Sequence, residues 1–453
     1  MRPALILGID GLPYTLARRL IDDGTMPNFG QLAQRGTLAQ MHTTVPDFSC
    51  VAWTSFATGV NPGKHGIYGF QDFHPVSGQS YMPTVTDCRA PALWHEVGKA
   101  GGRSVILNLP GTYPAMPLRG KMVAGFIAPD FEKSCYPATF AQTLKTLGYR
   151  MDLDGQMGLG GPQHVEQVIG PVFEARKVAI RHLIKNEYWD LCIAVITETD
   201  RLQHFFLHAL GDPSHPQHEW TRRFYVELDS FIGEVAEMLD GKADLFMVSD
   251  HGFDVVQRLV LVEDFLRDLG LAPPSEVPCW SNPEVAAKTH VFCLDPGRFY
   301  INRKGGRFPG GFVGEQEAQE ILQRLTLALW DLKDPDTGAP MVSSVRTKQE
   351  GFWGDTIDYA PDLIAATHPG YYFRAFVHPE KSRVVTIKWE ANHVWNDAIV
   401  FAPYALPADY QPMIWDVLPS ALSHMGIALP AGIDGRDLGN ISLADARAKT
   451  VSV

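Results

Sequence analysis

Three aspartates and three histidines occupy positions along the chain from which they could hold metal ions. Each follows or flanks a short apolar run of the kind that forms a buried strand. They are Asp10, Asp200, His204, Asp250, His251 and His393. Carboxylate oxygens and imidazole nitrogens are ligands for zinc and other divalent transition metals. Six such ligands could form two sets of three, each holding one metal ion and leaving coordination positions open. Two metal ions in such an arrangement bind the attacking and the leaving oxygen during displacement at phosphorus.

The spacing of these residues is informative in two places. Asp200 and His204 are four residues apart at the start of a predicted helix, so they share one face, and His208 continues that face as a structural or supporting residue. Asp250 and His251 are adjacent at the end of an apolar run. The competing interpretations are a helix-capping Asp with a surface His, and a buried hydrogen-bonded Asp–His pair.

A hydroxyl group stands at another predicted helix start. Ser49 begins the run Ser49–Thr58, which Gly59 should end. Free N–H groups and the dipole at a helix N-terminus favour an anion such as phosphate. A metal ion can lower the pKa of a bound hydroxyl and make it a nucleophile. The competing interpretation of Ser49 is an ordinary N-cap.

Buried strands must position these residues. The segment Ala4–Gly11 reads as a strand followed by a turn, and the apolar runs Trp189–Ile196 and Asp244–Ser249 are similar. Helical spacing between them, as in 162–186 and 219–239, indicates an α/β fold. In open α/β sheets ligands bind beyond the carboxyl ends of the strands, which is where Asp10 should lie.

The character of the chain changes after about residue 255. Strand and helix alternation becomes irregular up to about residue 390, and Pro and Gly are more frequent. We expect a core of residues 1–255 plus 390–440, an inserted smaller cap subdomain of residues 256–389, and a peripheral tail, 441–453. The Gly-rich stretch Gly155–Gly161 follows no strand and is predicted to be a loop.

The composition and net charge of the chain argue against some classes of binding partner. The 453 residues are 45% hydrophobic with a formal net charge of -12, which argues against nucleic-acid polymers or anionic membranes as partners. No window is apolar enough to span a membrane, and the first residues do not resemble a signal peptide. The six cysteines lack CxxC spacing. We therefore expect a cytoplasmic protein with reduced cysteines; the oligomeric state cannot be read from the sequence.

The motifs in combination resemble a known family. They are GIDG, SCVAWTSFATGVNPGKHGI, T-x-T-D-R-L-Q-H, SDHGF, and Asn-His before an apolar strand. The chain is similar to the alkaline phosphatase superfamily, most closely to its type I phosphodiesterase/nucleotide pyrophosphatase branch. This resemblance implies a three-layer α/β/α sandwich with a mostly parallel central sheet and an inserted cap. It covers most of the predicted core.

The resemblance also implies roles for the candidate residues. Asp10, Asp250 and His251 would hold one metal together with Ser49, the nucleophile. The other metal would be held by Asp200, His204 and His393. Attack by Ser49 would give a covalent phospho-enzyme, which water then hydrolyses. The 3-carboxylate, 3-His set suits two zinc ions and tolerates manganese or iron. Lys64 and His65 are further candidates for substrate binding.

Departures from the family pattern leave the substrate open. Cys50 is not followed by the C-x-P-x-R signature of sulfatases, which argues against a sulfatase. Gly69 and Phe70 occupy the neighbourhood of an Asn that holds a phosphoryl oxygen in related pyrophosphatases. The prediction is hydrolysis of a small phosphate ester, either a diester or a monoester. Phosphomutase or phosphotransferase activity, phosphonate hydrolysis and non-catalytic metal binding are the alternatives.

Overall fold

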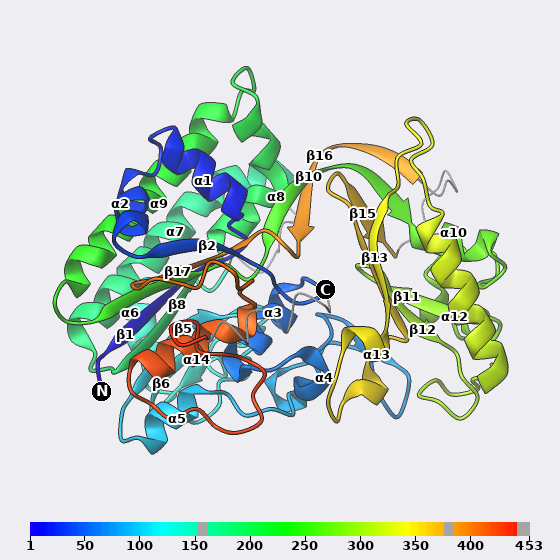
Figure 1. Cartoon of the computed structure of the whole chain (residues 1–453), viewed down its shortest axis with the longest axis horizontal. Coiled ribbons are helices and arrows are strands. Elements are labelled where there is room, and N and C mark those ends of the chain that lie inside the picture. Colours follow the sequence, from blue (N-terminus) through cyan, green and yellow to red (C-terminus); the bar gives the residue numbers. More distant parts are fainter. Residues whose placement is uncertain (153–160, 376–383, 442–453) are drawn as a thin grey trace. The chain divides into compact units, whose positions relative to one another are not determined.

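An eight-stranded sheet dominates the computed structural model, which describes residues 1–152, 161–375 and 384–441 (Figure 1). In order across the sheet, the strands are β2 (Thr37–Met41), β17 (Ala398–Ala402), β9 (Asp244–Val248), β1 (Ala4–Ile9), β8 (Leu191–Ile196), β5 (Ser104–Leu109), β6 (Gly120–Ala124) and β7 (Cys135–Tyr136). The strands from β9 to β6 are parallel to their neighbours, whereas β17 and β7 run antiparallel to theirs. The predicted mostly parallel sheet is confirmed.

The central strand β1 pairs with β8 on one side and with β9 on the other. Ala4 is level with Leu191 and with Asp244, and this register continues to Gly8. Because all three strands are parallel and start level, their carboxyl ends meet at one edge of the sheet. The residues that follow them in the chain are thereby brought together.

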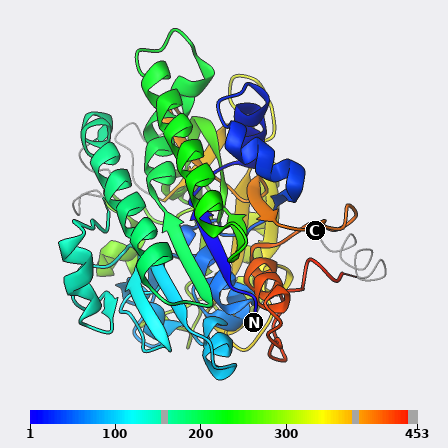
Figure 2. The same cartoon turned by 90° about the vertical axis from the view of Figure 1, so that its left-hand side faces the viewer.

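Helices cover both faces of this sheet. One face carries α1 (Tyr14–Asp22), α2 (Pro27–Arg35), α6 (Phe140–Thr146), α7 (Gly161–Asn186), α8 (Glu198–Gly211) and α9 (His218–Leu239). The opposite face carries α3 (Ser49–Thr58), α5 (Trp94–Lys99) and α14 (Ile414–His424). Alternate residues of β1 point to the two cores, Leu5 and Leu7 to the first and Ala4 and Ile6 to the second. Figure 2 shows α7 and α9 side by side against the sheet.

The chain divides into two compact units. The first consists of Met1–Asn61, Thr84–Phe253 and His393–Val453 and contains the large sheet, and the second consists of Pro62–Pro83 and Asp254–Asn392. The sequence analysis placed residues 62–83 in the core instead. Their contacts explain the difference, because Asp72 is buried and accepts a hydrogen bond from Tyr300 (3.1 Å), and the carbonyl of Gln71 accepts one from Arg298 (3.0 Å).

The second unit has sheets of its own in its described part. One contains β10 (Gly252–Leu261), β15 (Tyr371–Arg374) and β16 (Val384–Val394), and another contains β11 (Val291–Leu294), β12 (Arg298–Ile301), β13 (Val342–Thr347) and β14 (Leu363–Thr367). A small sheet pairs β3 (Asp72–Phe73) with β4 (Ser80–Tyr81). The helices are α4 (Pro62–His65), α10 (Val262–Asp268), α11 (Pro283–Ala286), α12 (Glu315–Trp330) and α13 (Lys348–Gly351). The buried side of α12 packs in this unit's own core.

Some sequence expectations lie outside the described residues. The region from 255 to 390, where the alternation of strands and helices is irregular, contains the long strands β10 and β16. The Gly-rich stretch Gly155–Gly161 lies almost wholly outside the described residues, as does the tail 441–453. No helix in the described ranges is both long and apolar enough to cross a membrane.

Gly8 shows how tightly α3 packs against the end of β1. A Cβ atom on Gly8 would lie 2.7 Å from the ring of Trp53 in α3 and 2.9 Å from Val195 in β8. Both neighbours are fully buried, so neither can move away without disturbing the core. Only glycine fits this position without such a shift.

We expect Gly8→Ala to lower the free energy of unfolding by about 1–3 kcal/mol, because the added methyl group overpacks the contact with Trp53. Urea denaturation of chelator-treated protein, followed by circular dichroism, measures the change. Gly211→Ala is the matched control, since a Cβ there meets nothing within 4 Å; it should stay within about 0.5 kcal/mol of the native protein. Equal stability of the two variants would contradict this packing argument.

Candidate metal centre and nucleophile

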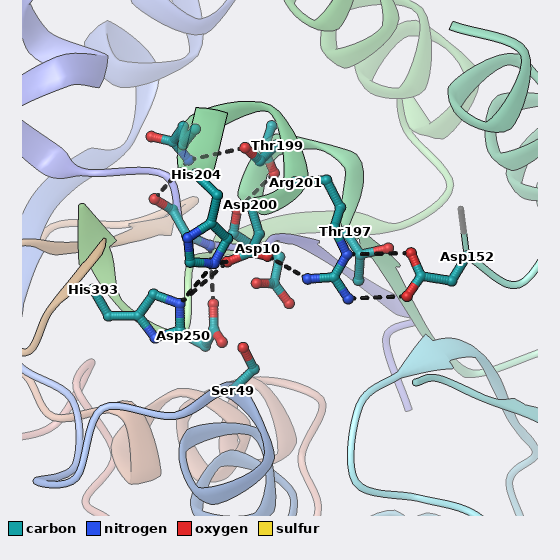
Figure 3. A network of polar contacts seen from close by, with 12 residues as sticks. Asp10, Ser49, Asp152, Thr197, Thr199, Asp200, Arg201, His204, Asp250 and His393 are labelled. Carbon is teal, nitrogen blue, oxygen red and sulfur yellow. Dashed lines mark hydrogen bonds and ion pairs between the residues drawn. The ribbon is translucent and has the colours of Figure 1, made fainter. Parts of the chain in front are cut away.

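The three candidate aspartates meet at the carboxyl edge formed by β9, β1 and β8. Asp10 directly follows β1, Asp250 follows β9 after one intervening residue, and Asp200 lies in the first turn of α8, which follows β8. Figure 3 shows their carboxylates turned toward one another, with Ser49 and His393 beside them. All three aspartates are at most 1% exposed. The tertiary structure thus concentrates three buried acids at one place.

Each of these carboxylates has one oxygen held by the protein and one oxygen with no hydrogen-bond partner. Trp53 Nε1 donates to Asp10 Oδ2 (3.0 Å), the Gly11 N–H donates to Asp250 Oδ1 (3.0 Å), and Arg201 Nη1 donates to Asp200 Oδ2 (2.6 Å). The other oxygens, Asp10 Oδ1, Asp250 Oδ2 and Asp200 Oδ1, are buried without a partner. Because buried polar atoms are normally satisfied, these three oxygens fit the role of metal ligands.

The imidazoles of His251 and His393 are held in the same way. His251 Nδ1 lies 3.0 Å from the carbonyl of Gly252, and His393 Nδ1 lies 3.0 Å from the carbonyl of Asp47. A carbonyl can only accept, so each Nδ1 carries a proton, which leaves Nε2 as the ring nitrogen that could bind a metal in the site. Histidines that bind metals are commonly oriented by such a bond at the other ring nitrogen.

Asp200, His204 and His393 have the mutual distances of a metal-ligand set. Asp200 Oδ1 lies 3.5 Å from His204 Nε2 and 3.4 Å from His393 Nε2, and the two Nε2 atoms are 3.4 Å apart. Ligands about 2.0–2.1 Å from a tetrahedral zinc ion are about 3.3–3.4 Å from one another. These three atoms could therefore share one ion with little rearrangement.

Asp10, Asp250 and His251 form a second group. His251 Nε2 lies 3.3 Å from Asp250 Oδ2 and 3.8 Å from Asp10 Oδ1, and Ser49 Oγ is 3.2 Å from the same nitrogen. His251 Nε2 also lies 3.9 Å from Asp200 Oδ1, and its ring stacks on that of His393 with centroids 3.6 Å apart. His251 therefore lies between the two groups and could serve either one.

Ser49 is the first residue of α3 and not its N-cap. The N-cap is Phe48, which makes no side-chain cap, so the N-cap interpretation of Ser49 is wrong. The hydroxyl instead points to His251 and is 2% exposed. A phosphoryl group at this hydroxyl would face the positive end of a ten-residue helix.

Burial and mutual repulsion shift the titration of the acids. Burial, with added repulsion from Asp250 and Asp200, raises the pKa of Asp10 well above its usual range. Burial raises the pKa of Asp250 to about 7, and Asp200 adds to the rise. Burial lowers the pKa of His251, which is therefore neutral at pH 7. Divalent cations would relieve the repulsion between the carboxylates and would find a neutral imidazole ready to bind.

Four residues that contact the candidate ligands were not predicted from the sequence. Phe253 packs edge-on against His204 (ring centroids 4.8 Å apart) and His393 (5.1 Å), and Trp53 and Arg201 hold carboxylate oxygens as described above. Thr199 Oγ1 donates to the carbonyl of Asp10 (2.6 Å), which anchors the turn after β1. Only their positions next to motif residues could have signalled these roles.

Three other residues, Lys64, His65 and His208, were singled out in the sequence. Lys64 and His65 lie in the second unit, where His65 is buried and its Nδ1 accepts the Ile67 N–H (3.1 Å). Their substrate-binding role therefore stays a prediction. His208 is farther along α8, and its Nε2 lies 3.3 Å from that of His215.

Comparisons with known proteins show the family and the fold of this chain. The family model described as type I phosphodiesterase/nucleotide pyrophosphatase matches residues 4–392. Phosphonoacetate hydrolase from Sinorhizobium meliloti 1021, in complex with phosphonoformate, is 17% identical with a TM-score of 0.64, covering 94% of this chain and 96% of that chain. Murine ectonucleotide pyrophosphatase/phosphodiesterase 5 is 14% identical with a TM-score of 0.54, covering 95% and 96% respectively. These neighbours share the fold.

The pKa shifts predict how pH affects the metal-free protein. Folded Asp10 and Asp250 keep protons at a pH where the unfolded chain has lost them, so folded protein binds more protons. These two carboxyl groups should therefore make stability fall as pH rises from about 4 to about 7, whereas His251, whose pKa is lowered by burial, makes a contribution of the opposite sign below about pH 6.5. Thermal unfolding of chelator-treated protein across this range measures the effect.

Asp250→Asn is the control variant for this prediction, because it removes the more clearly titrating carboxyl group and should flatten the pH dependence. Added zinc should reverse the loss in the native protein and, at about pH 6, should release protons on binding. A melting temperature that rises steadily with pH in the metal-free protein would contradict the assigned shifts.

Proposed function

This chain belongs to the type I phosphodiesterase/nucleotide pyrophosphatase family of phosphoric ester hydrolases, and we propose that it hydrolyses a small phosphate ester with two metal ions and a phospho-Ser49 intermediate. One observation carries the proposal. Three buried carboxylates each present an unpartnered oxygen within 3.3–3.9 Å of His251 Nε2, and Ser49 Oγ lies 3.2 Å from the same nitrogen. A purely structural polar cluster would not leave these oxygens unsatisfied.

We assign the candidate ligands to two sites. Asp10, Asp250 and His251 hold one metal beside Ser49, and the other is held by Asp200, His204 and His393. The short distances among the second three residues and the position of Ser49 beside His251 support this division. Oxygen and nitrogen donors favour zinc, with manganese or iron as alternatives. Bound metals would lower the pKa of the serine hydroxyl and stabilise charge on the phosphoryl oxygens.

The chain's own residues then carry out a two-step displacement. Ser49 Oγ gives up its proton to solvent and bonds to phosphorus, while the ester oxygen leaves with its electron pair and takes up a proton from solvent. The N-terminus of α3 lies at the resulting phosphoserine, where its backbone dipole favours negative charge. Water next attacks phosphorus, breaks the bond to Ser49 Oγ and releases the phosphate group. Trp53, Gly11 and Arg201 hold the carboxylates in place during both steps.

The second unit is proposed to act as the cap that selects the substrate. The chain leaves the first unit after Phe253, two residues beyond His251, and returns at His393. Candidate ligands thus border the insertion at both ends, so the segment between them is connected directly to the site. Its substrate is a small phosphodiester or monoester. No nucleic-acid polymer or membrane partner is proposed.

Phosphonate hydrolysis is the second candidate function. It is favoured by the similarity of fold to phosphonoacetate hydrolase over 94% of this chain. Phosphotransfer within or between substrates uses the same first step, with an alcohol replacing water as the acceptor. A panel of nitrophenyl monoester, nitrophenyl diester and phosphonoacetate, each with and without glycerol as acceptor, separates these possibilities.

Ser49→Ala should reduce kcat by at least about 10³-fold, because it removes the attacking oxygen but none of the six other ligands. Hydrolysis of a nitrophenyl phosphate ester by the zinc-loaded enzyme provides the measurement. Ser49→Thr is the matched variant, since it keeps a hydroxyl at the helix start, and should retain measurable turnover. Mass spectrometry after acid quenching should find phosphate on native Ser49 and none on the alanine variant.

Normal turnover by Ser49→Ala would exclude Ser49 as the nucleophile. Elemental analysis of the same preparations should find about two metal ions per chain in both the native protein and this variant. A protein that holds metal but turns over no member of the substrate panel would instead support a non-catalytic binding role.

A further inference from the structure

Arg201 is a buried cation beside a candidate metal ligand. It follows Asp200 in the first turn of α8, is 8% exposed, and donates from Nη1 to Asp200 Oδ2 at 2.6 Å. Its guanidinium also lies over the ring of Phe126, 4.4 Å from the centroid. A positive charge this close to a site for divalent cations would weaken their binding unless another group offsets it.

Asp152 supplies that offset. Arg201 Nε and Nη2 donate to the two carboxylate oxygens of Asp152 at 3.3 Å and 2.9 Å, as Figure 3 shows. This two-pronged geometry neutralises the guanidinium and also fixes its orientation. Consequently the remaining arm, Nη1, is directed at one oxygen of Asp200.

The contact determines which oxygen Asp200 can offer. Oδ2 is taken by Arg201, whereas Oδ1 has no hydrogen-bond partner and lies 3.5 Å from His204 Nε2 and 3.4 Å from His393 Nε2. Asp10 and Asp250 are each held by a neutral donor instead. The indole of Trp53 donates to Asp10, and the N–H of Gly11 donates to Asp250. The aspartate of the second set is therefore the one restrained by an ion pair.

We propose that Asp152 and Arg201 form a positioning pair that sets the metal affinity of the Asp200, His204 and His393 site by keeping Asp200 a one-oxygen ligand. The inference rests on the proposed two-metal function. Neither residue contacts substrate in this scheme. Their role is to direct Oδ1 of Asp200 toward the two imidazoles without adding net positive charge.

Variants of both residues test the pair. Arg201→Lys keeps the charge but loses the fork geometry, and Asp152→Asn keeps the shape but leaves the guanidinium charge unbalanced. Competition with a chromophoric chelator for zinc alone should show one of the two sites weakened by about 10–100-fold and the other unchanged. The loss of hydrolytic activity should become smaller as the zinc concentration is raised, with KM for the ester unaltered.

The matched control is a similar fork elsewhere in the first unit. Arg181 in α7 donates to Glu234 in α9 through Nε and Nη2, both at 2.8 Å, and neither residue is a candidate ligand or a sequence neighbour of one. Arg181→Lys should leave both zinc affinities unchanged. Melting temperatures of all variants, measured after chelation, separate effects on folding from effects on metal binding.

The zinc affinities of the native protein and its variants can have three outcomes for the proposed Asp152–Arg201 pair. Selective weakening of one zinc site in both Arg201→Lys and Asp152→Asn supports the pair. Native zinc affinities in a folded Arg201→Lys or Asp152→Asn variant would overturn it and leave the proposed function intact. Failure of the unaltered protein to bind zinc, manganese or iron would overturn the proposed function and this inference together.

Discussion

Three carboxylates that repel one another lie together in a buried site at one edge of the sheet. The surrounding strands and helices of the first unit hold them there. Asp10, Asp200 and Asp250 are nearly inaccessible to water, and each has one oxygen without a hydrogen-bond partner. Burying an ionised carboxylate without a partner raises the free energy of the folded protein, and the pKa values of Asp10 and Asp250 are raised as a result. Divalent cations would remove this penalty, so the same feature that destabilises the metal-free protein would make it bind metal.

The parallel arrangement of β9, β1 and β8 is what brings these acids together. Each strand is followed directly by residues of the site, because parallel neighbours in level register end at the same edge. The antiparallel strand β17 lies beyond β9, and the chain reaches it just after His393. A long insertion can separate His251 from His393 in sequence because both ends of the insertion return to this edge.

Groups around the ligands determine which atoms face the centre. An indole, a backbone N–H and a guanidinium each occupy one carboxylate oxygen, and two backbone carbonyls orient His251 and His393. Phe253 supports His204 and His393 from the side. Family membership accounts for the hydrolytic chemistry, and these contacts show how this chain holds its candidate ligands. They also explain why Gly8 is needed, since a side chain there would displace Trp53.

The sequence by itself determined the class of fold, the mostly parallel sheet and the family, because buried strands, helix starts and motif order are local or short-range signals. It also identified six candidate ligands and the helix Ser49–Thr58, whose bounds agree with α3. The assignment of those ligands to two metals came from the family resemblance and stays a proposal.

Only the tertiary structure decided which oxygen of each aspartate is held, and that Ser49 points to His251 and is not an N-cap. It also assigned Pro62–Pro83 to the second unit and showed that Asp152, 48 residues before Asp200, balances the charge of Arg201. These facts depend on contacts between segments distant in the chain. Residue type and spacing carry no record of such contacts, because side-chain direction and burial are set when the sheet and its helices pack.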